Sequence, residues 1–295
     1  GDKIRLSTYP YPRYTFGEHL TVTGKLSVPK NFVAYDGGPE FDYVSYLEKD
    51  GIRYTMFEPH IRSEGIETYS LQRFLFGIKH AFTSKAEELL PEPESSLLGG
   101  ILLGDKQGLS KETTVYFKNA GLIHILVLSG YNVTIVAESF MKLFSWLPPL
   151  FGQSLGVASI ILFALMTGAS STTVRASIMA LIAIGGRARA RRYNVTRALI
   201  CAGVSMVFIN PAILVFDISF QLSFMSTLAL LYVSPLVSDR IGFITEKYKL
   251  REMIATTLST LIFTAPFIVY SMGQLSLISL ISNILVGPVI PLAMF

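Results

Sequence analysis

The residues best suited to chemistry in this chain are polar side chains that stand inside long apolar segments. Arg175 lies in the stretch Thr172–Ala180. An arginine near the centre of a membrane helix costs about 2.5–3.5 kcal/mol. Two interpretations are open. In the first, Arg175 serves a function and faces an aqueous cavity or a partner inside a helix bundle. In the second, its long side chain only extends to the nearby end of its helix, where the charge reaches water.

A second polar group occupies one apolar segment and contains His124, Ser129, Gly130 and Asn132. These residues either line a polar path through a membrane or form ordinary hydrogen bonds between helices. In the second case Gly130 allows two helices to approach closely. Residue type alone does not separate the two interpretations.

A third polar group follows at Asp217, Gln221 and Ser223. Asp217 precedes an apolar run and is predicted to cap its helix, because a carboxylate there accepts hydrogen bonds from free backbone N–H groups. The alternative is an ion pair between Asp217 and Arg175, since both are expected near the outer face of the membrane. Gln221 and Ser223 would lie deeper.

Motifs for covalent chemistry are missing from the sequence. The chain has no G-x-x-x-x-G-K-[ST] phosphate loop and no G-x-S-x-G elbow, and its four histidines lack the spacing of metal ligands. The single cysteine, Cys201, excludes an internal disulfide. We therefore expect no catalytic residue, no metal site and no cofactor in this chain.

The first 60 residues mix basic and aromatic side chains. This mixture suits single-stranded nucleic acid, whose phosphates attract cations and whose bases stack on rings. A solvated barrel surface would explain the same composition. The expected DNA-binding residues are Lys3, Arg5, Arg13, Tyr14, Lys25 and Lys30.

The distribution of charge along the chain indicates two regions, one surrounded by water and one by lipid. Residues 1–60 carry fifteen charged side chains, residues 121–186 carry three, and residues 253–295 carry none. A water-exposed surface needs more polar coverage, whereas a bilayer core about 30 Å thick takes about 20 apolar residues per helix. The net charge of +4 is too small to indicate a polyanionic partner by itself.

The predicted elements divide the chain into three parts. Residues 1–60 are expected to form a small all-β, OB-like barrel, because short alternating runs are separated by Gly and Pro. Residues 61–120 form a helical connector with an amphipathic helix over 66–90, which either lies on the membrane surface or packs on the soluble domain. Residues 121–295 form a transmembrane domain of about seven helices, truncated at its carboxy-terminal end, and both chain ends are expected to be those of an excerpt.

The seven expected membrane spans are 121–145, 149–167, 171–186, 197–215, 217–238, 253–272 and 277–295. The third is short and the fourth contains Asn210-Pro211, so both are open to being broken or re-entrant. The loops 186–197 and 239–252 are rich in Arg and Lys, and the positive-inside rule places both in the cytoplasm. Counting back across the spans places the amino-terminal domain outside.

Several segments, in this order, resemble the ComEC competence-protein family. They are Leu102-Leu103-Gly104-Asp105 with Gly108-Leu109-Ser110, Ala120–Gly130, Val174-Arg175-Ala176 with Met179-Ala180, and Asn210-Pro211 with Phe220–Phe224. Phe41-Asp42-Tyr43 and Tyr46-Leu47 with Gly51-Ile52 resemble the end of that family's outer soluble domain. The resemblance covers nearly the whole chain.

The resemblance implies a channel in the bacterial cell membrane that passes one DNA strand into the cytoplasm during natural transformation. It implies an extracytoplasmic OB-like domain. The expected partners are single-stranded DNA, the lipid bilayer and other competence proteins, and a homo-oligomer stays open. Many members also carry a metallo-β-lactamase-like domain, whose histidine-rich motif is absent here. Tyr131-Asn132 stands where many members have Leu-His, so a role of that histidine does not transfer.

Two other functions stay open at this point. The chain would anchor a nuclease whose hydrolytic domain lies elsewhere in a longer parent, or it would transport another solute. A His/Asp-rich metal motif after Phe295 would favour the nuclease. Polyanion binding by residues 1–60, with a steep salt dependence, would count against the transport of another solute.

Overall fold

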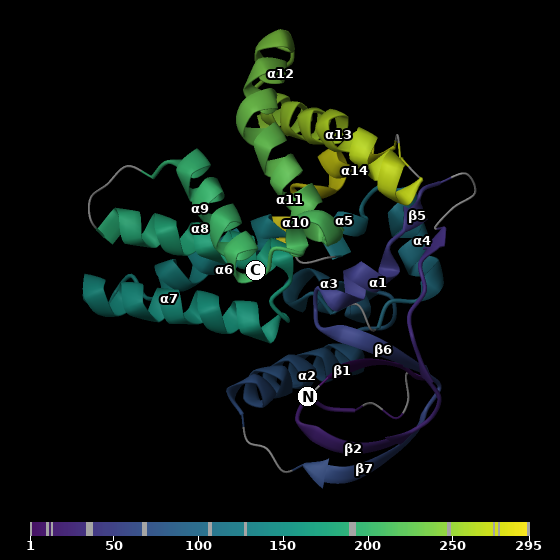
Figure 1. The fold of residues 1–295 in the computed structure, drawn as a ribbon. Coiled ribbons are helices and arrows are strands. Elements are labelled where there is room, and N and C mark those ends of the chain that lie inside the picture. Colours follow the sequence, from purple (N-terminus) through teal and green to yellow (C-terminus); the bar gives the residue numbers. More distant parts are fainter. Residues whose placement is uncertain are drawn as a thin grey trace.

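The structure is a computed structural model in which a strand-rich amino-terminal part leads into a helical remainder (Figure 1). It describes residues 2–9, 12, 14–33, 38–66, 70–105, 108–126, 129–188, 193–246, 249–273, 275–276 and 278–293. In this view β1, β2, β6 and β7 lie at the bottom together with α2, β5 lies higher beside α4, and the helices α8, α9, α11, α12 and α13 lie above them.

The amino-terminal part contains seven strands and one short helix among its described residues. They are β1 (Lys3–Ser7), β2 (Glu18–Thr23), β3 (Leu26–Ser27), β4 (Phe32–Val33), β5 (Glu40–Phe41), α1 (Tyr43–Glu48), β6 (Ile52–Phe57) and β7 (His60–Ile66). The predicted strands near Ile4, over 20–26 and over 52–57, and the helical turn after Phe41, are confirmed. Leu47 and Met56 are its buried hydrophobic side chains among the described residues.

The described strands form three separate small sheets. β6 lies between β1 and β3, β2 pairs with β7, and β4 pairs with β5. β1 and β6 are parallel, whereas β2 and β7 are antiparallel with Thr23 opposite His60. Closure of these sheets into one OB-like barrel is not seen among them and stays a prediction. The strands also continue past residue 60, because β7 ends at Ile66.

The connector holds the helices α2 (Leu71–Leu89), α3 (Glu94–Leu103) and α4 (Lys111–Asn119). The predicted amphipathic helix over 66–90 is confirmed as α2, and the Ser70 side chain caps it by accepting a hydrogen bond from Arg73 N at 3.2 Å. One face of α2 packs against α3 and α7. An apolar stripe stays exposed on α2 and consists of Leu71, Phe74, Ile78, Phe82 and Leu89.

The rest of the described chain is mainly helical. They are α5 (Ile123–Leu126), α6 (Gly130–Leu143), α7 (Pro149–Met166), α8 (Ser171–Ala188), α9 (Val195–Ile209), α10 (Ile213–Phe216), α11 (Ile218–Leu228), the π-helical turn η1 (Ala229–Val233), α12 (Ser234–Arg240), α13 (Leu250–Met272), α14 (Ser279–Val286) and α15 (Val289–Ala293). α11, η1 and α12 run on as one helix.

Three helices of the described chain are long and apolar enough to cross a membrane, namely Pro149–Met166, Ile218–Arg240 and Leu250–Met272. They coincide with the expected spans 149–167, 217–238 and 253–272, whereas seven crossings of the membrane stay a prediction. The first expected span is divided before α6, the fourth ends at Asn210-Pro211, and the last is divided between α14 and α15. Proline lacks the N–H that would continue a helix, which explains the end at Pro211.

Helix α8 is the centre of the helical part. It packs against α6, α7, α9 and α11. Its buried apolar side chains Ala176 and Ile184 belong to two core clusters, one with Val133 and Phe163 and one with Ala137 and Ile160. Because α8 is surrounded by helices, the polar side chains it carries are held between helices.

Candidate functional site

A cavity of about 460 Å³ runs beside α8, between α6 on one side and α11 with η1 on the other. Its lining residues are Gly130, Thr134, Ala137, Glu138, Met141, Arg175, Ala176, Met179, Ala180, Ala183, Ile184, Arg187, Tyr193, Thr227 and Leu230. The α8 members recur at intervals of three and four residues, which places them on one helical face. Three of them are alanines, and these short side chains leave the cavity open.

Arg175 lies at one end of this cavity and is 8% exposed. Its Nη1 donates a hydrogen bond to Oγ1 of Thr227, which in turn donates to the carbonyl oxygen of Ser223 at 2.8 Å. Its Cζ lies 5.9 Å from the centre of the Phe224 ring, within the range of a cation–π contact. Gly130 leaves room for the guanidinium, because a Cβ there would lie 2.8 Å from Nη2.

The charge of Arg175 is not compensated by an acidic side chain in the described part of the chain. Its Nε atom is buried and has no hydrogen-bond partner there. An isolated buried cation is strongly unfavourable unless something pairs with it. The site therefore favours an anionic group in the cavity, where the remaining N–H donors of Arg175 could bind it.

The cavity extends from Arg175 towards the basic end of α8. Arg187 and Tyr193 line its other end. Twelve residues separate the two arginines, which corresponds to about 18 Å along a helix. Glu138 also lines the cavity, but it forms no ion pair with either arginine in the described structure. The polar lining is therefore elongated and net positive.

The π-helical turn η1 contributes Leu230 to the same cavity. A π turn inserts an extra residue into a helix, and such turns occur frequently at functional sites. No motif in the sequence predicts this irregularity, so the contribution of η1 to the site is visible only in the fold.

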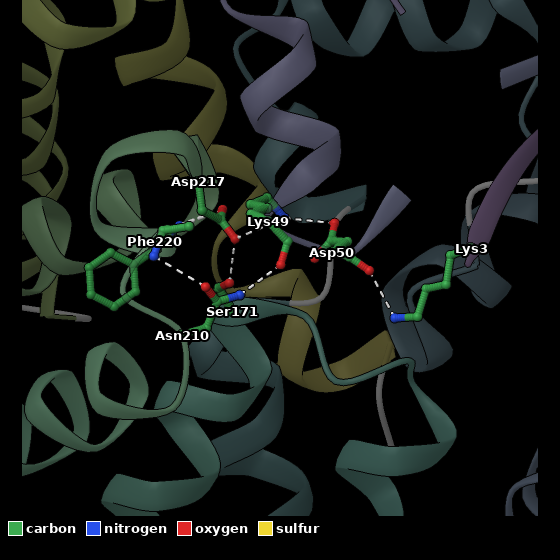
Figure 2. Close-up of polar contacts among 8 residues, drawn as sticks. Lys3, Lys49, Asp50, Ser171, Asn210, Asp217 and Phe220 are labelled. Carbon is green, nitrogen blue, oxygen red and sulfur yellow. Dashed lines mark hydrogen bonds and ion pairs between the residues drawn. The ribbon is translucent and has the colours of Figure 1, made fainter. Parts of the chain in front are cut away.

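A second polar cluster joins the strand part to the helices, and we call it the clasp: Lys3, Lys49, Asp50, Ser171, Asn210, Asp217 and Phe220 (Figure 2). Lys49 Nζ lies 3.6 Å from Oδ2 of Asp217, and both side chains are nearly buried, with 7% and 9% exposed. Ser171 Oγ donates to the same Oδ2 at 2.6 Å. The Asn210 side-chain amide donates to the Lys49 carbonyl at 2.8 Å.

The clasp keeps Lys49 charged. Burial disfavours the ammonium, but the hydrogen bond to Asp50 at 2.8 Å and the charge of Asp217 together raise the pKa of Lys49. Lys3 Nζ donates to the Asp50 carbonyl at 2.8 Å and extends the cluster to β1. The strand part is thus fastened to the first turns of α8 and α11, and Ser171 lies one turn before Arg175.

The expected cap at Asp217 is confirmed, because its Oδ1 accepts a hydrogen bond from Phe220 N at 3.0 Å. The alternative pairing of Asp217 with Arg175 is wrong. Asp217 pairs with Lys49, whereas Arg175 bonds to Thr227. Sequence reasoning missed Lys49, because a lysine at the end of a short helix gives no local sign of a partner so far along the chain.

Most of the other polar residues that were expected to line a path lie elsewhere. Ser129 caps α6, and Asn132 is buried and donates from Nδ2 to the Ile101 carbonyl at 3.0 Å. Gln221 donates from Nε2 to the carbonyls of Leu214 and Val215 at 2.9 and 3.0 Å. The residues His124, Ser129, Asn132, Asp217, Gln221 and Ser223 do not line the cavity, whereas Gly130 and Arg175 do.

The expected DNA-binding residues of the strand part are spread over it. Lys3 belongs to the clasp, and Arg5 lies 5.9 Å from the ring centre of Tyr43. Lys25 and Lys30 are both exposed, and Tyr14 lines a second cavity. Arg13 lies outside the described residues. No group of three or more possible metal ligands occurs in the described part of the chain.

Asn132→Ala should loosen the contact between α6 and α3. The substitution removes the donor of the Ile101 carbonyl and the partner of Ser129 Oγ, which lies 2.9 Å from Asn132 Oδ1. We expect a loss of about 1–3 kcal/mol in the free energy of unfolding, measured by chemical denaturation in detergent. Gln72→Ala, on the exposed side of α2, is the control and should change it by less than about 0.5 kcal/mol. Equal stability of both variants would contradict the buried role of Asn132.

The comparisons with known proteins agree with the motifs seen in the sequence. A family model described as competence protein matches residues 101–295, a range that contains every residue lining the cavity. ComE operon protein 3 of Bacillus subtilis (strain 168) is 24% identical over 278 residues, covering 92% of this chain and 34% of that protein. An uncharacterized protein of Aquifex aeolicus (strain VF5) is 30% identical over 159 residues, covering 53% of this chain and 38% of that protein.

The chain thus spans little more than a third of the length of these two relatives. No solved structure matches it. The three long apolar helices and the similarity to these proteins indicate a membrane protein. Because the family model covers the cavity, both ends of α8 and the helical half of the clasp, the sequence motifs and the fold lead to one conclusion: the chain belongs to the competence protein family.

Proposed function

We propose that this chain is the channel segment of a DNA-uptake machine in the bacterial cell membrane. It passes single-stranded DNA into the cytoplasm during natural transformation. The observation that carries the proposal is the uncompensated, buried Arg175 beside an elongated, net positive cavity between helices. A phosphate backbone supplies the negative charge that this cavity lacks.

The arrangement of the two ends supports a direction of transport. The clasp joins the strand part to the first turns of α8 and α11, and the basic segments follow the last turns of α8 and α12. Figure 1 shows those last turns far from the strands. By the positive-inside rule the basic segments 186–197 and 239–252 are cytoplasmic, and the OB-like amino-terminal domain is then extracytoplasmic.

Thiol accessibility tests the conduit. In a Cys201→Ser background, Ala180→Cys places a thiol on the cavity face of α8, and Ile182→Cys places one on an exposed apolar face outside the cavity. We expect a membrane-impermeant thiol reagent to modify Ala180→Cys and to stop uptake of labelled DNA. The matched variant Ile182→Cys should react slowly and keep its uptake, because lipid would cover it.

Two results would contradict the proposal. One is normal DNA uptake after complete modification of Ala180→Cys. The other is equal modification of both variants, which would mean that the cavity is no more accessible to water than the lipid-facing surface. The experiment is done in cells that lack the chromosomal copy, with the variant cysteines introduced into the gene that encodes this chain.

A further inference from the structure

A second cavity, of about 630 Å³, lies between the strand part and α2, away from the helices that surround Arg175. We call it the α2 pocket. The segment before β2 contributes Tyr14 and Phe16, and α2 contributes Phe76, Lys79 and His80. Its volume falls in the range of about 300–1,000 Å³ that is usual for small-ligand sites.

The α2 pocket has an aromatic platform. The rings of Phe16 and Phe76 are stacked, with centroids 5.2 Å apart and an interplanar angle of 28°. Phe16 remains 47% exposed, so one part of its ring is open to a further stacking partner. Tyr14 lines the same cavity. Flat aromatic ligands, including nucleobases, stack on such rings.

Basic side chains stand beside the platform. Lys79 and His80 line the pocket, and neither side chain has a hydrogen bond or ion pair within the described structure. Arg73 lines it too, together with the acids Glu87 and Asp105, and these three already have interaction partners. The groups left to bind a ligand are therefore one ammonium and one imidazole, which suit a single phosphate.

We propose that the α2 pocket holds one nucleotide of single-stranded DNA, with its base on the exposed ring of Phe16 and its phosphate beside Lys79 and His80. This inference rests on the proposed function and adds a binding site for the strand outside the cavity beside Arg175. An open ring beside Lys79 and His80 distinguishes a nucleotide from a phosphate-bearing lipid, which would use these two side chains and not the ring.

The test is the binding of a short fluorescent oligothymidylate, followed by anisotropy, to the purified full chain in neutral detergent at low salt. Lys79→Glu and Phe16→Leu should each weaken binding about 5- to 10-fold. The matched controls are Lys85→Glu on the same helix and Phe57→Leu on β6, both exposed and outside the pocket. Each control should stay within about 2-fold of the unaltered chain.

An abasic oligomer of equal length separates the two halves of the site. Without a base, Phe16→Leu should no longer weaken binding, whereas Lys79→Glu should weaken it as before. Binding that is insensitive to both pocket variants, or equally sensitive to Lys85→Glu, would overturn the pocket while leaving DNA binding by the chain intact. A chain that binds neither oligomer at low salt would instead count against the proposed function itself.

Discussion

Arg175→Ala is expected to lower the uptake of labelled DNA about 10- to 100-fold without lowering the amount of protein in the membrane. A charge-assisted hydrogen bond to a phosphate contributes about 1.5–3 kcal/mol, which corresponds to this range. The protein should not lose stability, because the substitution removes a buried charge that has no acidic partner in the described structure. Uptake and membrane protein level are measured in the same cells.

Two further variants show which property of Arg175 matters. Arg175→Lys keeps the charge but loses the planar fork of donors, so its uptake should be intermediate. Arg240→Ala removes an exposed arginine at the end of α12 and should leave uptake unchanged. Normal uptake by Arg175→Ala would show that DNA passage does not depend on Arg175. Loss of the protein from the membrane would show that Arg175 has a structural role instead.

Asp217→Ala is expected to have the largest effect on stability of any single substitution in the clasp. It leaves the buried Lys49 ammonium without its partner on α11 and removes the cap of that helix and the acceptor of Ser171 Oγ. Breaking a buried ion pair from one side costs about 3–5 kcal/mol. Chemical denaturation of the purified chain in detergent measures the change in the free energy of unfolding.

The controls for Asp217 use the other members of the clasp. Asp50→Ala removes a carboxylate that is 51% exposed and should cost less than about 1 kcal/mol. The double variant Lys49→Met with Asp217→Leu should recover part of the stability, because neither buried charge remains. A loss from Asp217→Ala no larger than that from Asp50→Ala would contradict the clasp.

The contribution of Lys49 also has a predictable dependence on pH. Its pKa is raised in the folded chain, so its stabilising effect is fully present below the unfolded value of about 10.4 and disappears as the pH rises through the folded value. Between about pH 6 and pH 9 the contribution of Lys49 to the free energy of unfolding should therefore stay constant. The difference in unfolding free energy between the unaltered chain and Lys49→Met gives this profile.

The sequence predicts the local features of this chain well. α2, α7, α8 and α13 lie where apolar periodicity and length predict helices, and the strands lie where alternation and turns predict them. The cap at Asp217 follows from its place before an apolar run. Arg175 stands out because a charge in an apolar helix is rare, and that signal needs no knowledge of other helices.

Other features depend on which elements pack together. Asn210 and Lys49 are 161 residues apart and still share a hydrogen bond, and the partner of Asn132 lies 31 residues away on α3. Periodicity and capping depend on neighbours within a few residues, so they carry no information about such partners. For the same reason, several polar residues that were expected beside Arg175 instead cap helices or donate hydrogen bonds to backbone carbonyl groups.

The sequence by itself thus determined that the carboxy-terminal part is apolar and largely helical, that two of its segments are rich in basic residues, and that Arg175 is exceptional. Only the tertiary structure decided that Arg175 faces a cavity with Gly130 and Thr227, and that Lys49 forms an ion pair with Asp217. The physical reason is that a helix is specified by interactions over a few residues, whereas a cavity and a buried ion pair exist only after distant helices have packed.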